Sequence, residues 1–434
     1  MIGVGAAGPA RQPGSVAGGA QAMIEPDRMV VAALAVADGI GPRRLSDLLG
    51  HHRSPEALLV AAREIRRRSA RARGRAGRRS TVGGRAPGAP ATTDPLVEDP
   101  GLVPRVLEAA AQVERLTDAV RALGLGVVTL DDATYPERLR RIDLPPPVLF
   151  VLGSIDALAA PNVVAVVGTR RPSEGGRRAA ARIAGALARA EVTVVSGLAL
   201  GIDGAAHRAC LDESGRTVAV LGSGHGVLTP RVHRQLADAM VGRGGAVVSE
   251  FAPWREAATW SFPRRNRLVS GLADATVVVE AGLGSGALIT AGWALEQGRE
   301  CFVVPGSMDA PTAAGGLRFL REHHGLARIV SDLPSLLEDL GLGAERAPIV
   351  VPGLSDLGPT AARVMERLAT ADATVDEIAI SLELPTAGVL AVLARLELAG
   401  LAVQGLGRYR PAGLLATRPS AGPAAGGPGP AVAR

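Results

Sequence analysis

Residues 163–204 read VVAVVGTRRPSEGGRRAAARIAGALARAEVTVVSGLALGIDG, and the architecture expected for the whole chain follows from this stretch. Two short β-branched runs each end in Gly, and a helix-length segment rich in Arg and Ala separates them. Short runs that are apolar throughout are typical of strands buried on both faces, and helix-length connections between them are typical of parallel βαβ units. The stretch therefore predicts a parallel sheet covered by helices on both sides.

The same alternation continues toward the C-terminus and extends the predicted sheet. The expected strands cover residues 163–167, 192–196, 217–221, 246–249, 276–280, 301–304 and 327–330. Several of them end in Gly, and ligands of such sheets bind beyond the carboxyl ends of the strands, where helix N-termini point outward. We expect an α/β fold with a Rossmann-like, doubly wound, mostly parallel sheet and a binding site at that edge.

The chain on either side of this sheet predicts smaller helical modules and two tails. Both ends of the chain are rich in Gly, Ala and Pro with little apolar periodicity, which is typical of disorder. The expected division is a disordered tail (1–25), a small helical domain of the helix-hairpin-helix or SAM-like kind (26–122) with an Arg-rich insertion (63–95), the Rossmann-like domain (123–343), a linker (344–357), a winged helix (358–414) and a second disordered tail (415–434). Between the insertion and the sheet, we expect one amphipathic helix over 100–123 that leads to a short strand at 127–130.

Two of these modules allow alternative interpretations. The turn Gly39-Ile40-Gly41-Pro42 resembles the hairpin of a helix-hairpin-helix, whose backbone N–H groups can meet a phosphate, but it also suits a plain turn in a helical bundle. The third helical pattern of the winged helix (386–400) has one Arg and no Asn or Gln for base edges. That module can therefore be a docking or dimerisation unit as well as a DNA reader.

Composition excludes several classes of protein. No run approaches 18 to 20 apolar residues, and the N-terminus has no basic region followed by an apolar block, so we expect a cytoplasmic protein with no membrane association. Cys210 and Cys301 are too few for a disulfide framework. Residues 63–85 hold ten Arg and one acid, so the positive charge of this segment alone exceeds the net charge of the whole chain, which is +6. The rest of the chain is therefore net acidic. A nucleic-acid site on the folded body must therefore come from local clustering of charge.

The segment FAPWREAATWSFPRRNR at 251–267 supplies such a cluster. It holds four of the ten aromatic residues of the chain, followed at once by three Arg and an Asn. Aromatic faces stack on unpaired bases and cations bind phosphates, so the segment suits single-stranded nucleic acid. Alternatively, the aromatics fill the core while the Arg residues cap a helix. The residues concerned are Phe251, Trp254, Trp260, Phe262, Arg264, Arg265, Asn266 and Arg267.

Three Gly-rich loops follow predicted strands and point to the same edge of the sheet. In residues 167–173, Gly lets the backbone approach a ligand and Arg170 can clamp a phosphate. In residues 280–290, glycines and the Ser285 hydroxyl suit a phosphate cradle, although a nucleotide cofactor competes with this interpretation. In the third loop, residues 196–207, Asp203 lies in the first turn of the following helix, where it suits the role of a helix-start residue better than that of a catalytic acid.

Catalytic and metal motifs are missing from the sequence. The chain has no Lys, so a P-loop is impossible, and neither GxSxG nor HExxH occurs. His207 and Cys210 lie three residues apart on a predicted helix, but two ligands do not make a zinc site. We expect no catalytic residue, no metal and no cofactor.

Several motifs appear in order at compatible spacing, and together they resemble the DNA-processing protein A family (DprA/Smf). They are GTRRPS (168–173), SGLALGIDGAAH (196–207), TVAVLGSG (217–224), SE (249–250), FPRRNRLVSGLAD (262–274) and VVVEAGLGSGALITAGWALEQGRECFVVPGS (277–307). The resemblance implies a homodimeric single-stranded DNA-binding protein of natural transformation that protects incoming strands and assists RecA loading, without catalysis. Carried over to this sequence, it implies a DNA-binding site formed by Gly168, Thr169, Arg170, Ser173, Phe262, Arg264, Arg265, Asn266, Arg267, Ser285, Gly286 and Thr290.

Two other functions compete with this one. The first is a nucleotide hydrolase similar to the phosphoribohydrolase-like Rossmann group, in which Glu280 would act; such enzymes carry a Pro-Gly-Gly-x-Gly-Thr loop where this chain has AGLGSG. The second is an adaptor whose winged helix and Arg-rich insertion recruit partners.

Overall fold

The computed structural model describes residues 26–76, 94–342, 358–370, 373–398, 401–405 and 407–411. The expected tails at 1–25 and 415–434, the expected linker at 344–357 and residues 77–93 of the Arg-rich insertion lie outside the described residues.

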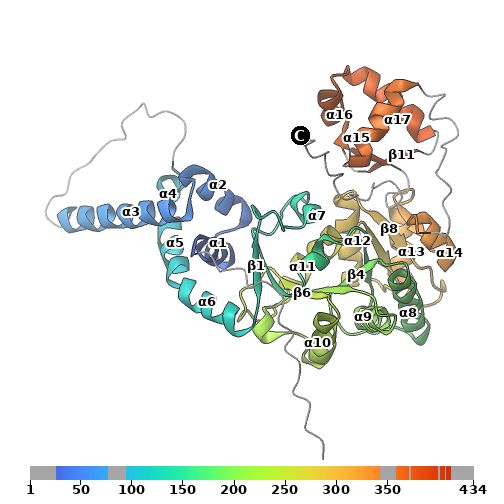
Figure 1. Ribbon diagram of the computed structural model, residues 1–434, viewed down its shortest axis with the longest axis horizontal. Coiled ribbons are helices and arrows are strands. Elements are labelled where there is room, and N and C mark those ends of the chain that lie inside the picture. The colour runs from blue at the N-terminus through green and yellow to red at the C-terminus, as the bar shows by residue number, and fades with distance from the viewer. Residues whose placement is uncertain are drawn as a thin grey trace, which may run out of the picture.

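A nine-stranded sheet is the centre of the described structure (Figure 1). Its strand order is β1-β2-β6-β5-β4-β3-β7-β8-β9, in which the strands from β6 to β9 run parallel and β1 and β2 pair antiparallel at one edge. The expected doubly wound, mostly parallel sheet is thus confirmed. The strands are β1 (Gly126–Thr129), β2 (Val148–Gly153), β3 (Val163–Val167), β4 (Thr193–Ser196), β5 (Thr217–Val220), β6 (Ala246–Ser249), β7 (Ala275–Val278), β8 (Glu300–Val303) and β9 (Ala327–Ile329).

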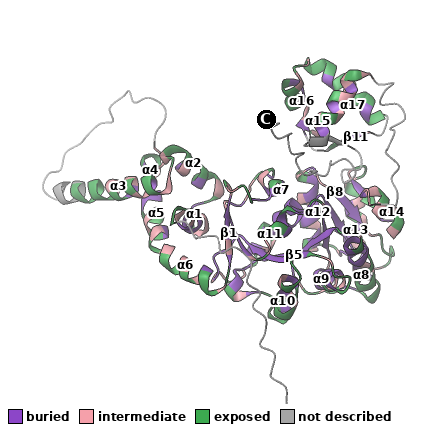
Figure 2. Ribbon diagram, viewed as in Figure 1, coloured by how far each residue is buried: buried purple, intermediate pink, exposed green. Residues whose placement is uncertain are grey.

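Helices cover both faces of this sheet, because successive side chains of each strand point to opposite faces. Val164 and Val166 of β3 are buried under α8 and α9, whereas Val163, Ala165 and Val167 are buried under α11 and α12. Figure 2 shows the strands buried along their length beneath partly exposed helices. The helices of this domain are α7 (Glu137–Arg140), α8 (Glu174–Arg189), α9 (Ile202–Asp212), α10 (Arg234–Gly242), α11 (Ser261–Leu272), α12 (Gly286–Glu296), α13 (Ala314–Glu322) and α14 (Leu333–Asp339), with 3₁₀ turns η1 (Asp156–Ala159), η2 (His225–Val227) and η3 (Arg231–His233).

The N-terminal helices form a small bundle that is docked on the antiparallel edge. Leu34, Leu48 and Val106 are among its fully buried residues. Helices α1 and α6 share a second apolar cluster with β1 and β2, in which Phe150 is fully buried. The helices are α1 (Pro26–Val36), α2 (Pro42–His52), α3 (Pro55–Ala76), α4 (Pro95–Glu98), α5 (Leu102–Ala111) and α6 (Val113–Ala122).

The structure differs from the sequence-based expectation at three places. Residues 63–76 of the expected Arg-rich insertion belong to α3, because Arg and Ala favour helix and Arg68 pairs with Glu64 at 2.9 Å. The single helix expected over 100–123 is two helices that meet at Gln112, whose N–H turns back to Ala109 O. Strand β2 is additional; it pairs antiparallel with β1 and β6 and therefore lies outside the alternation of strands and helix-length segments that predicts the parallel strands.

The C-terminal module has the winged-helix arrangement of three helices and a small sheet. Val364, Val389 and Leu393 are among the residues of its fully buried core. Its elements are α15 (Pro359–Thr370), α16 (Val375–Leu382), α17 (Thr386–Leu398) and a β10-β12-β11 sheet made of β10 (Ala373–Thr374), β11 (Ala402–Gly405) and β12 (Arg408–Pro411). The domain boundaries themselves stay a prediction. Among the described residues no single helix is long and apolar enough to cross a membrane; only α16 and α17 taken together as a bent pair reach that length and composition.

Candidate nucleic-acid interface

A hollow lies where the strand order of the sheet reverses. Strand β3 is flanked by β4 on one side and β7 on the other, so the loops that leave β3 and β7 diverge to opposite faces. This reversal is the usual ligand site of doubly wound sheets. We name it the switch-point hollow; it holds about 600 Å³ and is lined by residues 167–171, 197, 199, 203, 259, 262, 263, 265, 266, 269, 282–287, 289 and 290.

Phe262 and Arg170 meet in this hollow although they lie on different elements. The Arg170 Cζ stands 4.9 Å from the centroid of the Phe262 ring, a cation–π distance. Arg170 is exposed at the loop after β3, whereas Phe262 is half-buried in the first turn of α11. A Cβ built on Gly222 would come within 2.8 Å of the ring, so this Gly lets the ring lie against the end of β5. The two residues that the sequence predicts as stacking ring and phosphate clamp are therefore adjacent.

The loop after β3 is held so that its backbone borders the hollow. The Thr169 N–H donates to Glu280 O at 2.7 Å, which ties this loop to the end of β7. A Cβ on Gly168 would lie 2.5 Å from Ile202 Cγ1, so only Gly allows α9 to pack this close. The structure thus places Gly168, Thr169 and Arg170 together on one wall.

The opposite wall is the start of α12. The Ser285 Oγ accepts a hydrogen bond from Ala287 N at 3.4 Å and caps this helix. Asn266 donates from Nδ2 to Gly286 O at 3.0 Å and links α11 to the same turn. Thr290 lines the hollow one turn further on and is 2% exposed. A helix N-terminus with uncharged walls attracts an anion through its free N–H groups.

Arg265 lies on the floor of the hollow and is 4% exposed. Its guanidinium donates to Gly197 O at 2.7 Å and to Val220 O, and it lies flat against Gly197, where a Cβ would approach it to within 2.6 Å. Burial lowers the pKa of Arg265 to about 10, and the nearby Asp203 carboxylate opposes that shift. Arg265 therefore anchors the ends of β4 and β5 and adds positive potential, rather than reaching out to a phosphate as expected from the sequence.

Three other predicted contact residues lie outside the hollow. Arg267 has a side chain 5% exposed and pairs with Glu250 at 2.7 Å, so we correct its expected DNA contact to a structural role. Arg264 pairs with the same carboxylate at 3.2 Å and faces a different cavity. Ser173 caps α8 by accepting from Gly176 N at 3.0 Å. Helix α11 turns about 100° per residue, so neighbouring Arg residues cannot share one site.

The Glu280 carboxylate is hydrogen-bonded to Ser173, the residue that caps the N-terminus of α8. Its Oε2 accepts hydrogen bonds from Ser173 N at 3.0 Å and from Ser173 Oγ at 3.1 Å. A Cβ on Gly176 would lie 1.8 Å from that oxygen, so the first turn of α8 sits directly on the carboxylate. Glu280 is 8% exposed and is not among the residues that line the hollow.

Sequence reasoning missed two residues that shape this site, Gly197 and Gly222. Each follows a predicted strand, which is the signal by which the sequence could have found it. In both cases the side chain that leaves no room for a Cβ comes from α11, which is distant in sequence. Among the described residues, one group has metal-binding spacing: His51, His52 and Asp94. There the His52 Nε2 is hydrogen-bonded to Asp94 Oδ1 at 3.1 Å, and that carboxylate also caps α4, so hydrogen bonding accounts for the cluster.

Comparison with known proteins identifies the family. Residues 126–341 match the family model of DNA recombination-mediator protein A, and residues 351–408 match the DprA winged helix domain. The putative DNA processing protein DprA of Mycobacterium tuberculosis (strain H37Rv) is 39% identical over 319 residues, which cover 70% of this chain and 82% of that protein. The chain belongs to the DprA/Smf family. Within this DprA/Smf family, protein Smf of Escherichia coli K12 is 37% identical over 63% of this chain and 74% of that protein.

Among solved structures, DprA from Streptococcus pneumoniae aligns with a TM-score of 0.49 at 34% identity, over 55% of this chain and 82% of that one. The resemblance expected from the motifs is therefore confirmed by sequence comparison, and this DprA/Smf chain is a DNA-processing protein that carries a winged helix.

Proposed function

We propose that this protein binds single-stranded DNA in the switch-point hollow without cutting it and passes the strand to a RecA recombinase. The observation that carries the proposal is the stack of the Arg170 guanidinium on the Phe262 ring at the mouth of the hollow. A base can take the place of the guanidinium on the ring, while the freed guanidinium binds a neighbouring phosphate. Stacking contributes about 1–3 kcal/mol per base, and an exposed cation–π contact about 0.5–1 kcal/mol, so the exchange favours the bound strand.

The rest of the hollow suits a polynucleotide backbone. The start of α12 and the loop after β3 present backbone N–H groups, and Arg170, Arg171 and Arg265 outnumber the single acid, Asp203. Burial raises the pKa of Asp203, and its carboxylate accepts from the N–H groups of Gly197 and Ala199, so it is turned toward the protein. The local field at the hollow is therefore positive although most of the chain is net acidic.

Binding without catalysis is also part of this proposal. The hydrolase alternative needs Glu280 as a free acid at the ligand, but its carboxylate is shared by the Ser173 N–H and hydroxyl groups. A general acid or base must reach the proton it transfers, and Glu280 does not border the hollow. A role in natural transformation, homodimer formation and protection of incoming strands belong to the same proposal through the family.

One affinity comparison tests the proposal. Binding of a labelled oligothymidylate, the matching duplex and a mononucleotide to the full chain is measured by fluorescence anisotropy, together with turnover of the mononucleotide. We expect the single strand to bind most tightly and no turnover. Tight mononucleotide binding with hydrolysis would instead support the hydrolase.

A second arm separates the adaptor alternative. Exchanging the exposed Arg66, Arg67 and Arg68 of α3 for Gln should leave strand binding largely intact, whereas Arg170→Ala should weaken it. Loss of strand binding on the α3 change alone would favour the adaptor. Light scattering of the full chain tests the homodimer, and a binding assay with purified RecA tests the transfer partner.

A further inference from the structure

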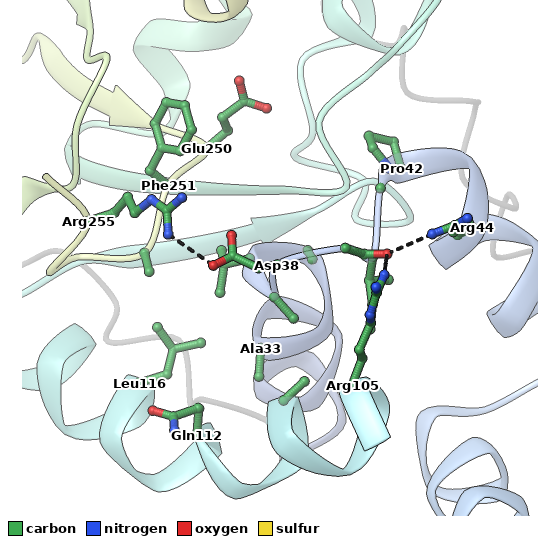
Figure 3. Close-up of a pocket in the computed structure, with 18 of the residues that line it drawn as sticks. Ala33, Asp38, Pro42, Arg44, Arg105, Gln112, Leu116, Glu250, Phe251 and Arg255 are labelled. Carbon is green, nitrogen blue, oxygen red and sulfur yellow. Dashed lines mark hydrogen bonds and ion pairs between the residues drawn. The ribbon is translucent and has the colours of Figure 1, made fainter. Parts of the chain in front are cut away.

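A second cavity lies between the N-terminal helices and the sheet domain, and the functional proposal above makes no use of it. It holds about 800 Å³. Its walls are the turn between α1 and α2, the facing sides of α5 and α6, and the segment that leads from β6 into α11 (Figure 3). We name it the interdomain groove; it is lined by residues 33, 35–44, 105, 108, 109, 112, 115, 116, 144, 250–252, 254, 255, 260 and 264.

The groove is rich in arginine from both domains. Six Arg line it, against three acids. Two of the acids are already paired, since Asp38 binds Arg255 at 3.2 Å and Glu250 binds Arg264 at 3.2 Å. The six are Arg43, Arg44, Arg105, Arg115, Arg255 and Arg264.

Three of these Arg residues form no ion pair with a described carboxylate, so their charge is available to a ligand. Arg43, Arg105 and Arg115 are exposed, and in the described part of the chain no carboxylate lies within ion-pair distance of them. The chain therefore gathers unneutralised guanidinium groups from α2, α5 and α6 around one cavity, which favours a ligand that carries several negative charges.

Aromatic rings stand among these cations. Two of the three Trp residues of the chain, Trp254 and Trp260, line the groove. Arg115 lies over the Trp254 ring at 4.1 Å and Arg255 over the Trp260 ring at 5.6 Å. Trp260 is 47% exposed, although an indole this large is usually more covered. The exposed Trp260 ring and the half-buried Trp254 ring, beside free guanidinium groups, match the stacking and phosphate contacts that hold unpaired nucleic acid.

The α1–α2 turn is fixed with its helix start toward the groove. Gly39 has a φ of +83°, and its carbonyl accepts from Arg44 at 3.1 Å and from Arg105 at 3.0 Å, as the dashed lines of Figure 3 mark. L side chains rarely adopt this φ, so the turn favours Gly, and a Cβ here would also displace the Arg105 guanidinium from the Gly39 carbonyl. Helix α2 then begins at Pro42 with no side-chain cap, which leaves its first N–H groups for a ligand.

The groove and the switch-point hollow share a wall, which is the start of α11. Thr259 and Phe262 line the hollow, Trp260 lines the groove between them in sequence, and Arg264 and Arg265 again face opposite sides. The start of α11 thus carries one ring on each side, Phe262 toward the hollow and Trp260 toward the groove.

We infer that the interdomain groove is a second section of the same single-strand path, in which Arg43, Arg105 and Arg115 bind phosphates and Trp254 and Trp260 stack on bases. This inference rests on the proposed function. It commits to an unpaired strand, because the two indole rings add nothing to the binding of a duplex whose bases are already stacked. It also assigns the Gly39–Pro42 turn a phosphate contact, one of the two interpretations open from its sequence.

Oligomer length separates the two sections of the path. Labelled oligothymidylates of about 5 and about 16 nucleotides, near the two ends of common single-strand site sizes, are titrated onto the full chain. The double variant Arg43→Gln/Arg115→Gln should bind the long oligomer more weakly and lower its salt slope by about 1.4, with the short oligomer unchanged. Arg121→Gln, an exposed change on the same helix α6 but outside the groove, should match wild type for both lengths.

Tryptophan fluorescence gives an independent readout. The long oligomer should quench the emission, because two of the three Trp residues line the groove, and Trp260→Phe should remove part of that quenching. Thermal unfolding of each variant checks that the fold is intact.

The outcomes also separate this inference from the proposed function. Wild-type binding of both lengths by the double variant, while Phe262→Ala still weakens both, would overturn the groove and leave the function standing. Wild-type binding by all these variants would overturn both. A loss of duplex affinity that exceeds the loss of long-strand affinity would also overturn the groove as a path for unpaired DNA.

Discussion

The Phe262→Ala substitution removes the one ring of the switch-point hollow and leaves its charges in place. In the structure the ring is half-buried against Gly222 and covered on its open side by Arg170, with 4.9 Å between the Arg170 Cζ and the ring centroid. A bound base must displace the guanidinium to stack there. The loss on substitution is therefore the stacking free energy less the cation–π contact that wild type gives up on binding.

The two terms set the size of the effect. Stacking of about 1–3 kcal/mol less a contact of about 0.5–1 kcal/mol leaves about 0–2.5 kcal/mol; the middle of the range, about 1.25 kcal/mol, is about 8-fold in the dissociation constant. The slope of affinity against salt should stay unchanged, because the ring releases no counterions. The combination of weaker binding and an unchanged slope distinguishes lost stacking from lost charge.

Salt-titrated fluorescence anisotropy with an oligothymidylate measures both quantities. Phe262→Trp should bind at least as tightly as wild type, while Phe262→Leu, which keeps apolar volume without a π-face, should behave like Phe262→Ala. Thermal unfolding of the three variants provides the control for folding. If the Leu variant binds as wild type does, the ring fills space and the stacking argument fails.

Three further predictions concern charge and stability. Arg170→Ala should lower the salt slope of single-strand binding by about 0.7, whereas Arg182→Ala, an exposed change on α8, should leave it unchanged in the same titration. Glu250→Gln breaks a buried pair with Arg267 and should destabilise the fold by about 3–5 kcal/mol in urea unfolding, far more than a change at the 41% exposed side chain of Arg264; equal effects would contradict the buried pair. Burial lowers the pKa of His207 to about 3, below its unfolded value, so the unfolded chain binds the proton first and stability should fall as pH drops from about 6.5 toward 3. Urea unfolding at several pH values checks this, and His207→Met should flatten that dependence.

Much of the fold was predictable from local pattern. The alternation of short apolar runs with helix-length segments identifies the strands from β3 to β9 within a residue or two, since both faces of a parallel sheet demand apolar residues. Strand β2 was not predicted because it is antiparallel to β1 and β6 and is not part of the alternation of strands and helix-length segments. The helical part of the Arg-rich segment was not predicted because its exposed face carries no apolar signal.

The candidate site was predictable in part. Gly168, Arg170 and Ser285 follow strands at one edge of the sheet, and chain order alone brings such loops together. The FPRRNR segment was harder, because its residues belong to a helix whose faces point to different surroundings. Phe262 and Arg265 face the hollow, Arg264 faces the groove, and Arg267 turns inward to Glu250.

The sequence alone predicts the doubly wound sheet, the edge at which ligands bind and the kinds of side chain at that edge. These features depend on short-range periodicity and on the Gly residues that follow the strands. Only the tertiary structure shows which Arg side chains face a ligand site and which are buried in the protein. A guanidinium is free or engaged according to the carboxylates and carbonyls within about 3 Å. Those partners lie on other elements, Gly197 and Val220 for Arg265 and Glu250 for Arg267.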